Sequence, residues 1–400
     1  MPESDYHMTN SVYWIWMQQL FGVATSRAHY MAELCEDPKT LFESVTAGEI
    51  PLERSEKVRT AQKCFEHAKH IEETSRKKGI DIITPDHMDY PDLLQTIYSK
   101  PLVLYVKGSL SVLKEGLPIA MVGTRYPTQY GKWAANKIAA ELTSVGAIIV
   151  SGLANGIDSE CHQAALQNGG STIGIMGCGL DFDYPRGSSR LKSEMKNQGA
   201  VISEYPLGFA PHAGTFPPRN RIIAGMCRGT IIVEAKEASG ALITIQHALD
   251  AGRDTFAIPG SIASQEHSGV HKLLRDGGAK LITSARDVLE EYPEYISALV
   301  AMNKEVKLSA NDCDLTKAPD IKAETTDTTK NEPIKRPTLP NSSGDDIKAV
   351  YKHVSETPKT TSVIAAQASI QISAVMAAIT ELEIMGFVQS HPGGFFSIVG

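Results

Sequence analysis

The chain has 400 residues, 42% of them hydrophobic, and a formal net charge of -7. This length and apolar content are enough for two or three domains, at least one of them with a large core. The acidic balance excludes a basic surface over the whole protein, so a nucleic-acid site would have to be a local basic patch.

Cysteine usage and the N-terminal composition narrow the class of protein. No two cysteines form a C-x-x-C pair or have a metal-ligand partner at short spacing, which gives zinc and iron–sulfur sites little support. Single thiols suit a reducing compartment. The first residues show no signal-peptide pattern, and no apolar run approaches the roughly 20 residues of a membrane span. We expect a soluble, cytoplasmic protein with no metal, no cofactor and no membrane contact. The six cysteines are Cys35, Cys64, Cys161, Cys178, Cys227 and Cys313.

The first 80 residues are predicted to form a small all-α domain. Apolar residues recur at helical spacing over residues 13–34 and again over residues 59–78. The segment of residues 20–34, with Gly22 between apolar residues, fits a helix-hairpin-helix, in which a glycine turn meets DNA phosphate. It also fits a small helical protein-docking domain, and we favour that interpretation because one glycine between apolar helices is unspecific.

A lead-in segment and an α/β domain are predicted over residues 81–300. The lead-in, residues 81 to about 116, begins with a short strand-like run at residues 81–84. Seven short apolar runs then alternate with helical stretches as far as about residue 292, a pattern typical of βαβ units and a parallel sheet buried on both faces. The predicted strand runs are PIAMVG, AIIVSG, STIGIMG, AVISE, GTIIVE, DTFAIPG and KLITS.

The remainder is predicted to be a linker and a winged helix. Residues 303–342 contain few large apolar groups and are interpreted as a flexible linker. Residues 343–400 show helical stretches followed by a two-stranded hairpin, which is the pattern of a winged helix. The predicted fold class is therefore α/β, a Rossmann-like doubly wound parallel sheet with a small all-α N-terminal domain and a C-terminal winged helix.

The strand ends are the predicted ligand site, because ligands of open α/β sheets bind outside the carboxyl ends of the strands. Three of these ends carry small or polar residues before a helix, where free backbone N–H groups favour an anion. Arg125 adds a planar guanidinium for phosphate oxygens. The residues singled out at the three ends are Gly123, Thr124 and Arg125; Ser151 and Gly152; and Ser239 and Gly240.

A further basic stretch lies between the fourth and fifth predicted strands of the α/β domain. Arg219, Asn220 and Arg221 follow two prolines at an expected helix start, which would place positive charge beside free N–H groups. Surface salt bridges are the alternative role for these arginines. Arg186 adds another cation after the third strand. Ring faces for unpaired bases are offered by Tyr184, Tyr205 and Phe216, although covering loop cores is equally compatible with their positions.

Enzymatic candidates are few. The first turn of the α/β domain reads G-T-R-Y-P-T rather than G-x-G-x-x-G, and no Walker A sequence occurs, so nicotinamide, flavin and P-loop chemistry are not expected. Ser151, Asp158 and His162 suggest a Ser-His-Asp set, but capping by Asp158 and packing by His162 explain the spacing more simply. Glu234 could be a general acid or base, or could anchor the loop that follows it.

Seven motifs in order resemble the DNA-processing protein A (DprA, or Smf) family over nearly the whole chain. They are MVGTR (121–125), SGLANGID (151–158), MGCGLDFDYP (176–185), ISEYPLG (202–208), FPPRNRIIAG (216–225), SGALIT (239–244) and AIPGS (257–261). The resemblance implies an extended Rossmann fold and a sterile-alpha-motif-like N-terminus. It also implies a homodimer that binds single-stranded DNA and loads a RecA-type recombinase during natural transformation. In this resemblance Arg125 is the best DNA contact, and Asn155 replaces a common arginine.

Three functions remain open at this point. The leading hypothesis is a non-enzymatic single-stranded-DNA-binding protein. The alternative is a Rossmann-like nucleotide-processing enzyme of the phosphoribohydrolase type, although the nearest counterpart of its P-G-G-x-G-T loop, residues 259–262, matches poorly. The third is an adaptor whose winged helix contacts protein, since the expected second helix of that domain, residues 372–385, has no Lys or Arg.

Overall fold

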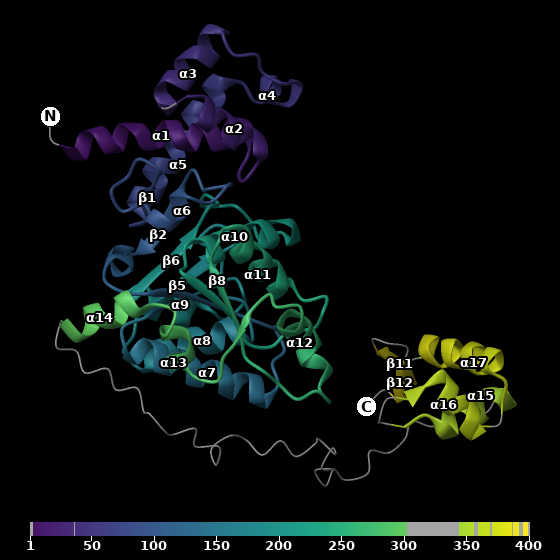
Figure 1. Cartoon of the computed structure of the whole chain (residues 1–400). Coiled ribbons are helices and arrows are strands. Elements are labelled where there is room, and N and C mark those ends of the chain that lie inside the picture. Colours follow the sequence, from purple (N-terminus) through teal and green to yellow (C-terminus); the bar gives the residue numbers. More distant parts are fainter. Residues whose placement is uncertain are drawn as a thin grey trace. The chain divides into compact units, whose positions relative to one another are not determined.

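The computed structural model describes residues 3–35, 37–301, 344–355, 359–368, 370–385, 387–391 and 395–398. The chain divides into two compact units, residues 1–321 and residues 322–400, which are described separately (Figure 1). The expected linker at residues 303–342 lies outside the described residues, as does Cys313.

A nine-stranded sheet organises the first unit, and it contains all seven strands predicted for the α/β domain. The order is β1-β2-β6-β5-β4-β3-β7-β8-β9, and every neighbouring pair from β6 to β9 is parallel. The bounds are β3 Pro118–Val122, β4 Ile148–Ser151, β5 Thr172–Met176, β6 Gly199–Ser203, β7 Gly229–Ile232, β8 Asp254–Ala257 and β9 Lys280–Leu281.

The lead-in segment adds two strands that the parallel pattern does not predict as part of the sheet. β2 (Leu104–Gly108) pairs antiparallel with β6, and β1 (Asp81–Ile83) pairs antiparallel with β2. The short helices of this segment are α6 (Asp92–Gln95) and η1 (Ser111–Lys114). The sheet is therefore mixed at this edge, because the chain enters it through a hairpin-like pair instead of a crossover helix.

Helices cover both faces of the sheet, as the apolar strands require. Alternate residues of β3 illustrate this: Ile119 and Met121 pack with α7, α8 and α13, whereas Ala120 and Val122 pack with α6, α10, α11 and α12. The bounds are α7 Gln129–Ser144, α8 Ile157–Gln167, α9 Ser189–Met195, η2 Ala213–Thr215, α10 Phe216–Gly225, α11 Gly240–Asp250, η3 Gln265–His267, α12 Ser268–Arg275, α13 Ala285–Leu289 and α14 Pro293–Ala301.

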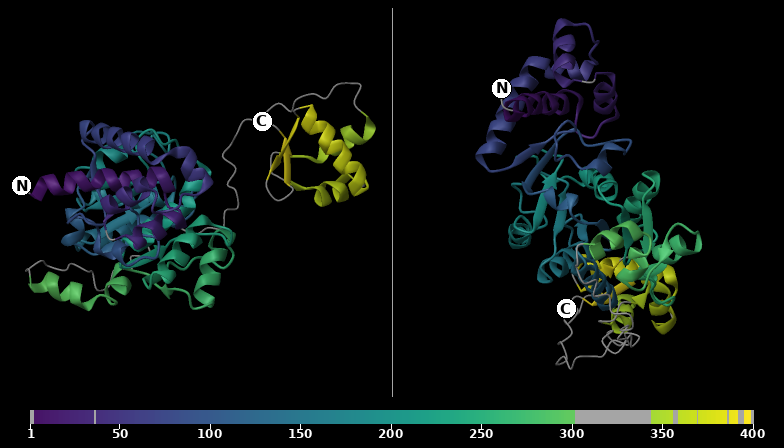
Figure 2. Two further views of the ribbon diagram at one scale, coloured as in Figure 1. Left: turned by 90° about the horizontal axis from the view of Figure 1, so that it is seen from above. Right: turned by 60° about the vertical axis from the view of Figure 1, so that its left-hand side comes forward.

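The N-terminal helices form a second core that is continuous with the lead-in strands (Figure 2). Trp16 and Leu20 of α1 are fully buried in it, and Leu102, Val103 and Tyr105 of the lead-in join the same apolar cluster. The expected boundary near residue 80 therefore falls inside one compact unit. The bounds are α1 Glu3–Phe21, α2 Ser26–Leu34, α3 Pro38–Ala47, α4 Arg54–Arg59 and α5 Ala61–Lys77.

The second unit has the winged-helix arrangement that the sequence predicts. Three helices pack around a core that includes Val350, Ile364 and Leu382, and β11 pairs antiparallel with β12 to form the wing. The bounds are α15 Asp345–His353, β10 Lys359–Thr360, α16 Thr361–Ala368, α17 Ile372–Ile384, β11 Val388–His391 and β12 Phe395–Ile398. Across the described part of the chain, no helix combines the length and the apolar character needed to cross a membrane.

Candidate functional site

A cavity of about 630 Å³ opens at the carboxyl ends of the parallel strands. It lies where the strand order reverses between β3 and β7, which is the usual ligand position in an open α/β sheet. The end of β3, the start of α10 and the start of α11 supply most of its walls. The predicted site residues that line it are Gly123, Thr124, Arg125, Arg219, Asn220, Ser239 and Gly240.

Arg125 is the exposed cation of this cavity. Its guanidinium carbon lies 6.0 Å from the centre of the Phe216 ring. Among the described residues no carboxylate lies within ion-pair distance of Arg125. A free guanidinium on an exposed loop is suited to a phosphate, because its planar fork can donate two parallel hydrogen bonds.

Arg219 has a different role from Arg125, although both face the Phe216 ring. It is buried, and its guanidinium donates to the carbonyls of Gly152 and Ile175. Burial, together with the neighbouring Arg125, lowers the pKa of Arg219 to about 10, although Asp158 opposes the shift. Arg219 is still charged at neutral pH. It supplies a fixed positive charge in the cavity wall and ties the ends of β4 and β5 to α10.

The start of α11 forms the opposite wall. Ser239 is the N-cap, and its hydroxyl accepts from the Ala241 amide. No heavy atom lies within 4 Å of where a Cβ on Gly240 would stand, so an approaching ligand can reach this backbone. Asn220 donates from Nδ2 to the Gly240 carbonyl at 3.4 Å and thereby links α10 to this helix start. The Gly240 backbone at this helix start is therefore accessible from the cavity.

The loop after β4 is not an open anion site, which corrects the expectation for Ser151 and Gly152. The Asp158 carboxylate accepts from the Gly152 and Ala154 amides, so the loop already holds an anion from its own chain. Ser151 is buried and donates to the Met121 carbonyl. Neither Ser151 nor Gly152 lines the cavity, and burial raises the pKa of Asp158.

Arg221 is also not a cavity residue, which corrects a second expectation. Its two terminal nitrogens donate to the Glu204 carboxylate at 2.9 and 2.7 Å, and its Nε donates to the Ser99 carbonyl. Both partners of the ion pair are buried. The salt-bridge alternative therefore holds for Arg221, in a buried form.

The loop after β5, the third predicted strand, also differs from the predicted site. Arg186 is exposed but is not part of the cavity wall, whereas Tyr184 lines it, with its ring 5.0 Å from that of Phe216. Tyr205 is buried and stacks on Phe209 outside the cavity. Of the three aromatic residues considered, Tyr184 and Phe216 present a surface to the cavity.

Two residues of the site were missed by sequence reasoning. Tyr126 follows Arg125 and is 88% exposed, and His212 stands on the loop before α10. An aromatic residue directly after a strand-end arginine was the available signal for Tyr126. His212 had no comparable signal, because its position depends on how residues 204–215 cross the strand ends.

The candidate catalytic groups are engaged in structural contacts. The His162 ring bonds Thr172 Oγ1 at 2.7 Å, so a Ser151–His162 relay is not formed. Glu234 accepts from the amide and hydroxyl of Thr128, so it anchors the loop before α7 and not the loop that follows it, and burial raises its pKa. No cluster of three or more His, Cys, Asp or Glu side chains suited to a metal ion occurs in the described residues.

Comparisons with known proteins place this fold and site in one family. The family model for DNA recombination-mediator protein A matches residues 81–293, and that for the DprA winged helix domain matches residues 335–394. Protein Smf of Synechocystis sp. is 37% identical over 329 residues, covering 80% of this chain and 81% of the relative. DNA processing protein DprA of Streptococcus pneumoniae is 48% identical over 204 residues, covering 51% of this chain and 71% of the relative.

Solved structures agree with the sequence comparisons. The X-ray structure of DNA processing protein A from Streptococcus pneumoniae superimposes with a TM-score of 0.56 and 36% identity, covering 72% of this chain and 96% of that one. The chain belongs to the DNA recombination-mediator protein A family, whose members include DprA and Smf.

Proposed function

We propose that this protein binds single-stranded DNA in the strand-end cavity and passes it to a RecA-type recombinase, without breaking or forming covalent bonds. The observation that carries the proposal is Arg125, an exposed guanidinium without a carboxylate partner among the described residues, at a cavity whose opposite wall is a helix start. Phosphate is the ligand group that these two features favour together.

The aromatic residues favour an unpaired strand. The guanidinium groups of Arg125 and Arg219 each lie 6.0 Å from the centre of the Phe216 ring, and the Tyr184 ring is next to it. Bases of a single strand can stack on such rings, whereas the bases of a duplex are already stacked. Since phosphate and ring contacts carry little sequence information, we expect binding that does not depend on the base sequence.

A binding role without catalysis is supported by the state of the acidic groups. Asp158, which lines the cavity, accepts from the Gly152 and Ala154 amides, and Glu234 accepts from Thr128. The alternative, a nucleotide-processing enzyme, predicts release of free base from nucleoside monophosphates. Incubation with each monophosphate and chromatography of the products tests it, and a released base would overturn the binding-only proposal.

The partners follow from the family and are part of the proposal. We propose a cytoplasmic homodimer that loads the recombinase onto DNA during natural transformation. The test is the rate at which a RecA-type filament assembles on single-stranded DNA coated with single-strand-binding protein. Faster assembly in the presence of this chain supports loading, and an unchanged rate would restrict the role to DNA binding.

The DNA site itself is tested by fluorescence anisotropy with a labelled oligo-dT and its duplex counterpart across a salt series. Arg125→Ala is expected to weaken oligo-dT binding about tenfold and to reduce the salt slope by about 0.7, the contribution of one phosphate contact on a single strand. The matched control is Arg190→Ala, which removes an exposed cation of α9 that pairs with Glu194. Equal affinities of Arg125→Ala and the unaltered protein would remove the cavity assignment.

A further inference from the structure

A second cavity, of about 870 Å³, lies between the N-terminal helices and the loop that precedes α10. The end of α1 and the turn before α2 form one wall, and residues 205–218 form the other. We call this cavity the hairpin groove. It is lined by the turn residues Gly22, Val23 and Ala24, by Gln18, Arg59 and His67, and by parts of the opposite loop.

The turn in the hairpin groove presents backbone donors. Gly22 has φ +99°, and a Cβ there would stand 2.7 Å from Thr25 Cγ2, so the turn requires glycine. Thr25 then caps α2 by accepting from the Ala28 amide. Within the described residues, the recorded hydrogen bonds leave the amides of Val23 and Ala24 without an acceptor. Two open amides beside a helix start favour an anion.

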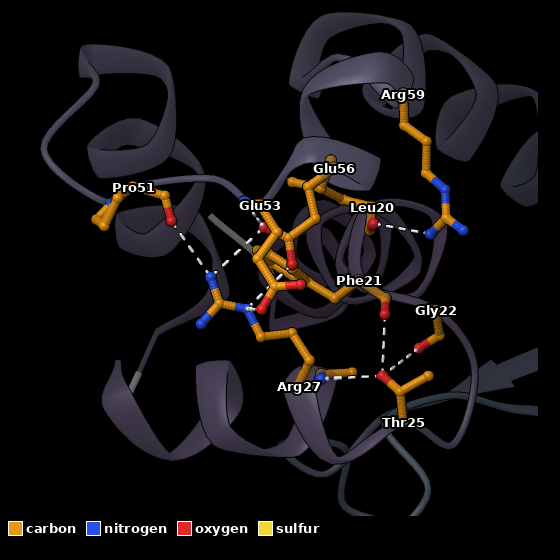
Figure 3. Close-up of polar contacts among 10 residues, drawn as sticks. Leu20, Phe21, Gly22, Thr25, Arg27, Pro51, Glu53, Glu56 and Arg59 are labelled. Atoms are coloured by element: carbon orange, nitrogen blue, oxygen red, sulfur yellow. Dashed lines mark hydrogen bonds and ion pairs between the residues drawn. The ribbon is translucent and has the colours of Figure 1, made fainter.

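The positive charge that Arg59 brings to the hairpin groove is not neutralised. Arg59 donates to the Leu20 carbonyl at 2.9 Å, beside the turn (Figure 3), and no carboxylate of the described residues lies within ion-pair distance of it. His67 is exposed and contacts Gln19. No Asp or Glu occurs among the described residues that line the groove. On a chain with net charge -7, such a surface is selective for negative charge.

Gln18 is the independent observation that points to a ligand. Its side chain is only 2% exposed, it lines the hairpin groove, and neither its amide nitrogen nor its amide oxygen has a hydrogen-bond partner in the described structure. An unsatisfied buried amide costs free energy that an apolar residue of the same shape would avoid. A ligand that offers both a donor and an acceptor, as a nucleotide base does, would satisfy it.

The hairpin groove adjoins the strand-end cavity at His212. His212 lines both cavities, and the segment around it divides its residues between them: Pro211, Ala213 and Phe216 face the strand-end cavity, whereas Thr215 faces the groove. A strand whose phosphate lies at Arg125 can therefore continue past His212 into the groove.

We propose that the hairpin groove binds the continuation of the single strand held in the strand-end cavity, with a phosphate at the Val23–Ala24 amides and Arg59 and a base at Gln18. This inference rests on the proposed function and extends it. The N-terminal helical segment is then part of the DNA path, and the helix-hairpin-helix interpretation of residues 20–34 takes precedence over a purely protein-docking one.

The test compares oligo-dT of about 5 nucleotides with oligo-dT of about 16, lengths near the two ends of the range of site sizes known for single-strand binders. Val23→Glu places a carboxylate in the turn. It is expected to weaken binding of the long probe about threefold to tenfold with a lower salt slope, and to leave the short probe unchanged, whereas Arg125→Ala weakens both. Leu34→Glu is the matched control, since it adds the same charge to an exposed position of α2 outside the groove.

Gln18→Met gives a second, independent measurement on the full chain. Because it replaces an unsatisfied amide with an apolar side chain of similar length, it is expected to raise the urea midpoint of unfolding and to weaken only the long probe. A raised midpoint with full affinity, or equal long-probe affinity of Val23→Glu and Leu34→Glu, would overturn the hairpin-groove proposal. If the unaltered protein binds neither probe, the proposed function itself fails, so the two failures are distinguishable.

Discussion

At the residue scale, the His162 ring and the Thr172 hydroxyl form a buried polar pair between α8 and β5. Thr172 Oγ1 donates its only hydrogen to the Ile149 carbonyl, so the His162 Nδ1 that contacts it must carry the hydrogen of that bond. His162 Nε2 is then the unprotonated nitrogen, and it has no partner in the described structure. Burial lowers the pKa of His162 to about 3 for this reason, since a second proton would place a charge in an apolar core.

The pH dependence of stability is the prediction at this scale. The folded-state pKa of His162 lies below the ordinary value of about 6.5, so the unfolded chain binds the extra proton first as the pH falls. The contribution of neutral His162 to the free energy of unfolding is therefore fully present above pH ~6.5. It is lost progressively as the pH falls to about 3. Urea unfolding measures the free energy of unfolding at pH 7 and at pH 5. The decrease between the two pH values should be smaller for His162→Gln than for the unaltered protein. An equal loss in both would show that other groups cause the acid sensitivity.

At the scale of elements, α10 is held by contacts on two sides. Arg219 ties it to the ends of β4 and β5, and Arg221 ties it to Glu204 after β6 and to the lead-in at Ser99. Residues two apart on a helix are separated by about 200° around its axis, so these two arginines point in opposite directions. The helix that carries the cavity wall is thus positioned by charges on both flanks, only one of which reaches the ligand site.

Removing one partner of the buried ion pair should destabilise the fold strongly. Glu204→Gln leaves the Arg221 guanidinium buried without a counter-charge, at a cost of about 3–5 kcal/mol in the free energy of unfolding. The double variant Glu204→Leu, Arg221→Met should show a smaller decrease in the free energy of unfolding, because no uncompensated charge remains. Urea unfolding of the three proteins measures both effects. A larger loss in the double variant than in Glu204→Gln would mean that packing, not charge, dominates at this contact.

At the scale of the whole molecule, the two units differ in the candidate binding sites that they contain. Both cavities belong to residues 1–321. The helix of the winged-helix unit that would enter a DNA groove, α17, contains no Lys or Arg, and Ile372 and Met376 are exposed on it. Apolar exposed residues on such a helix suit a protein contact more than a phosphate backbone.

Truncation tests whether the winged-helix unit contributes to DNA binding. A protein that ends at residue 321 should bind oligo-dT with an affinity within about twofold of the full chain and with an unchanged salt slope, because phosphate contacts set that slope. Anisotropy with the same probe gives both values, and circular dichroism checks that the truncated protein is folded. A large loss of affinity in a folded fragment would assign a DNA contact to the winged-helix unit.

The seven parallel strands, their order along the chain and the winged helix followed from the sequence, since the spacing of apolar runs is a local property. The position of Arg125 followed as well, because a residue directly after a strand of a parallel sheet must stand at its carboxyl edge. The sequence did not predict which of the other cations face the cavity. Arg219 and Arg221 are placed by the Gly152, Ile175 and Glu204 groups, all distant in sequence.

Fold class and the site edge were therefore determined by the sequence alone, through local periodicity and strand-end composition. The tertiary structure decided that the loop after β4 holds the Asp158 carboxylate, that the lead-in joins the sheet antiparallel, and that His212 lies between two cavities. These features depend on which distant groups satisfy each buried donor and acceptor, and that pairing is settled only when the whole chain packs.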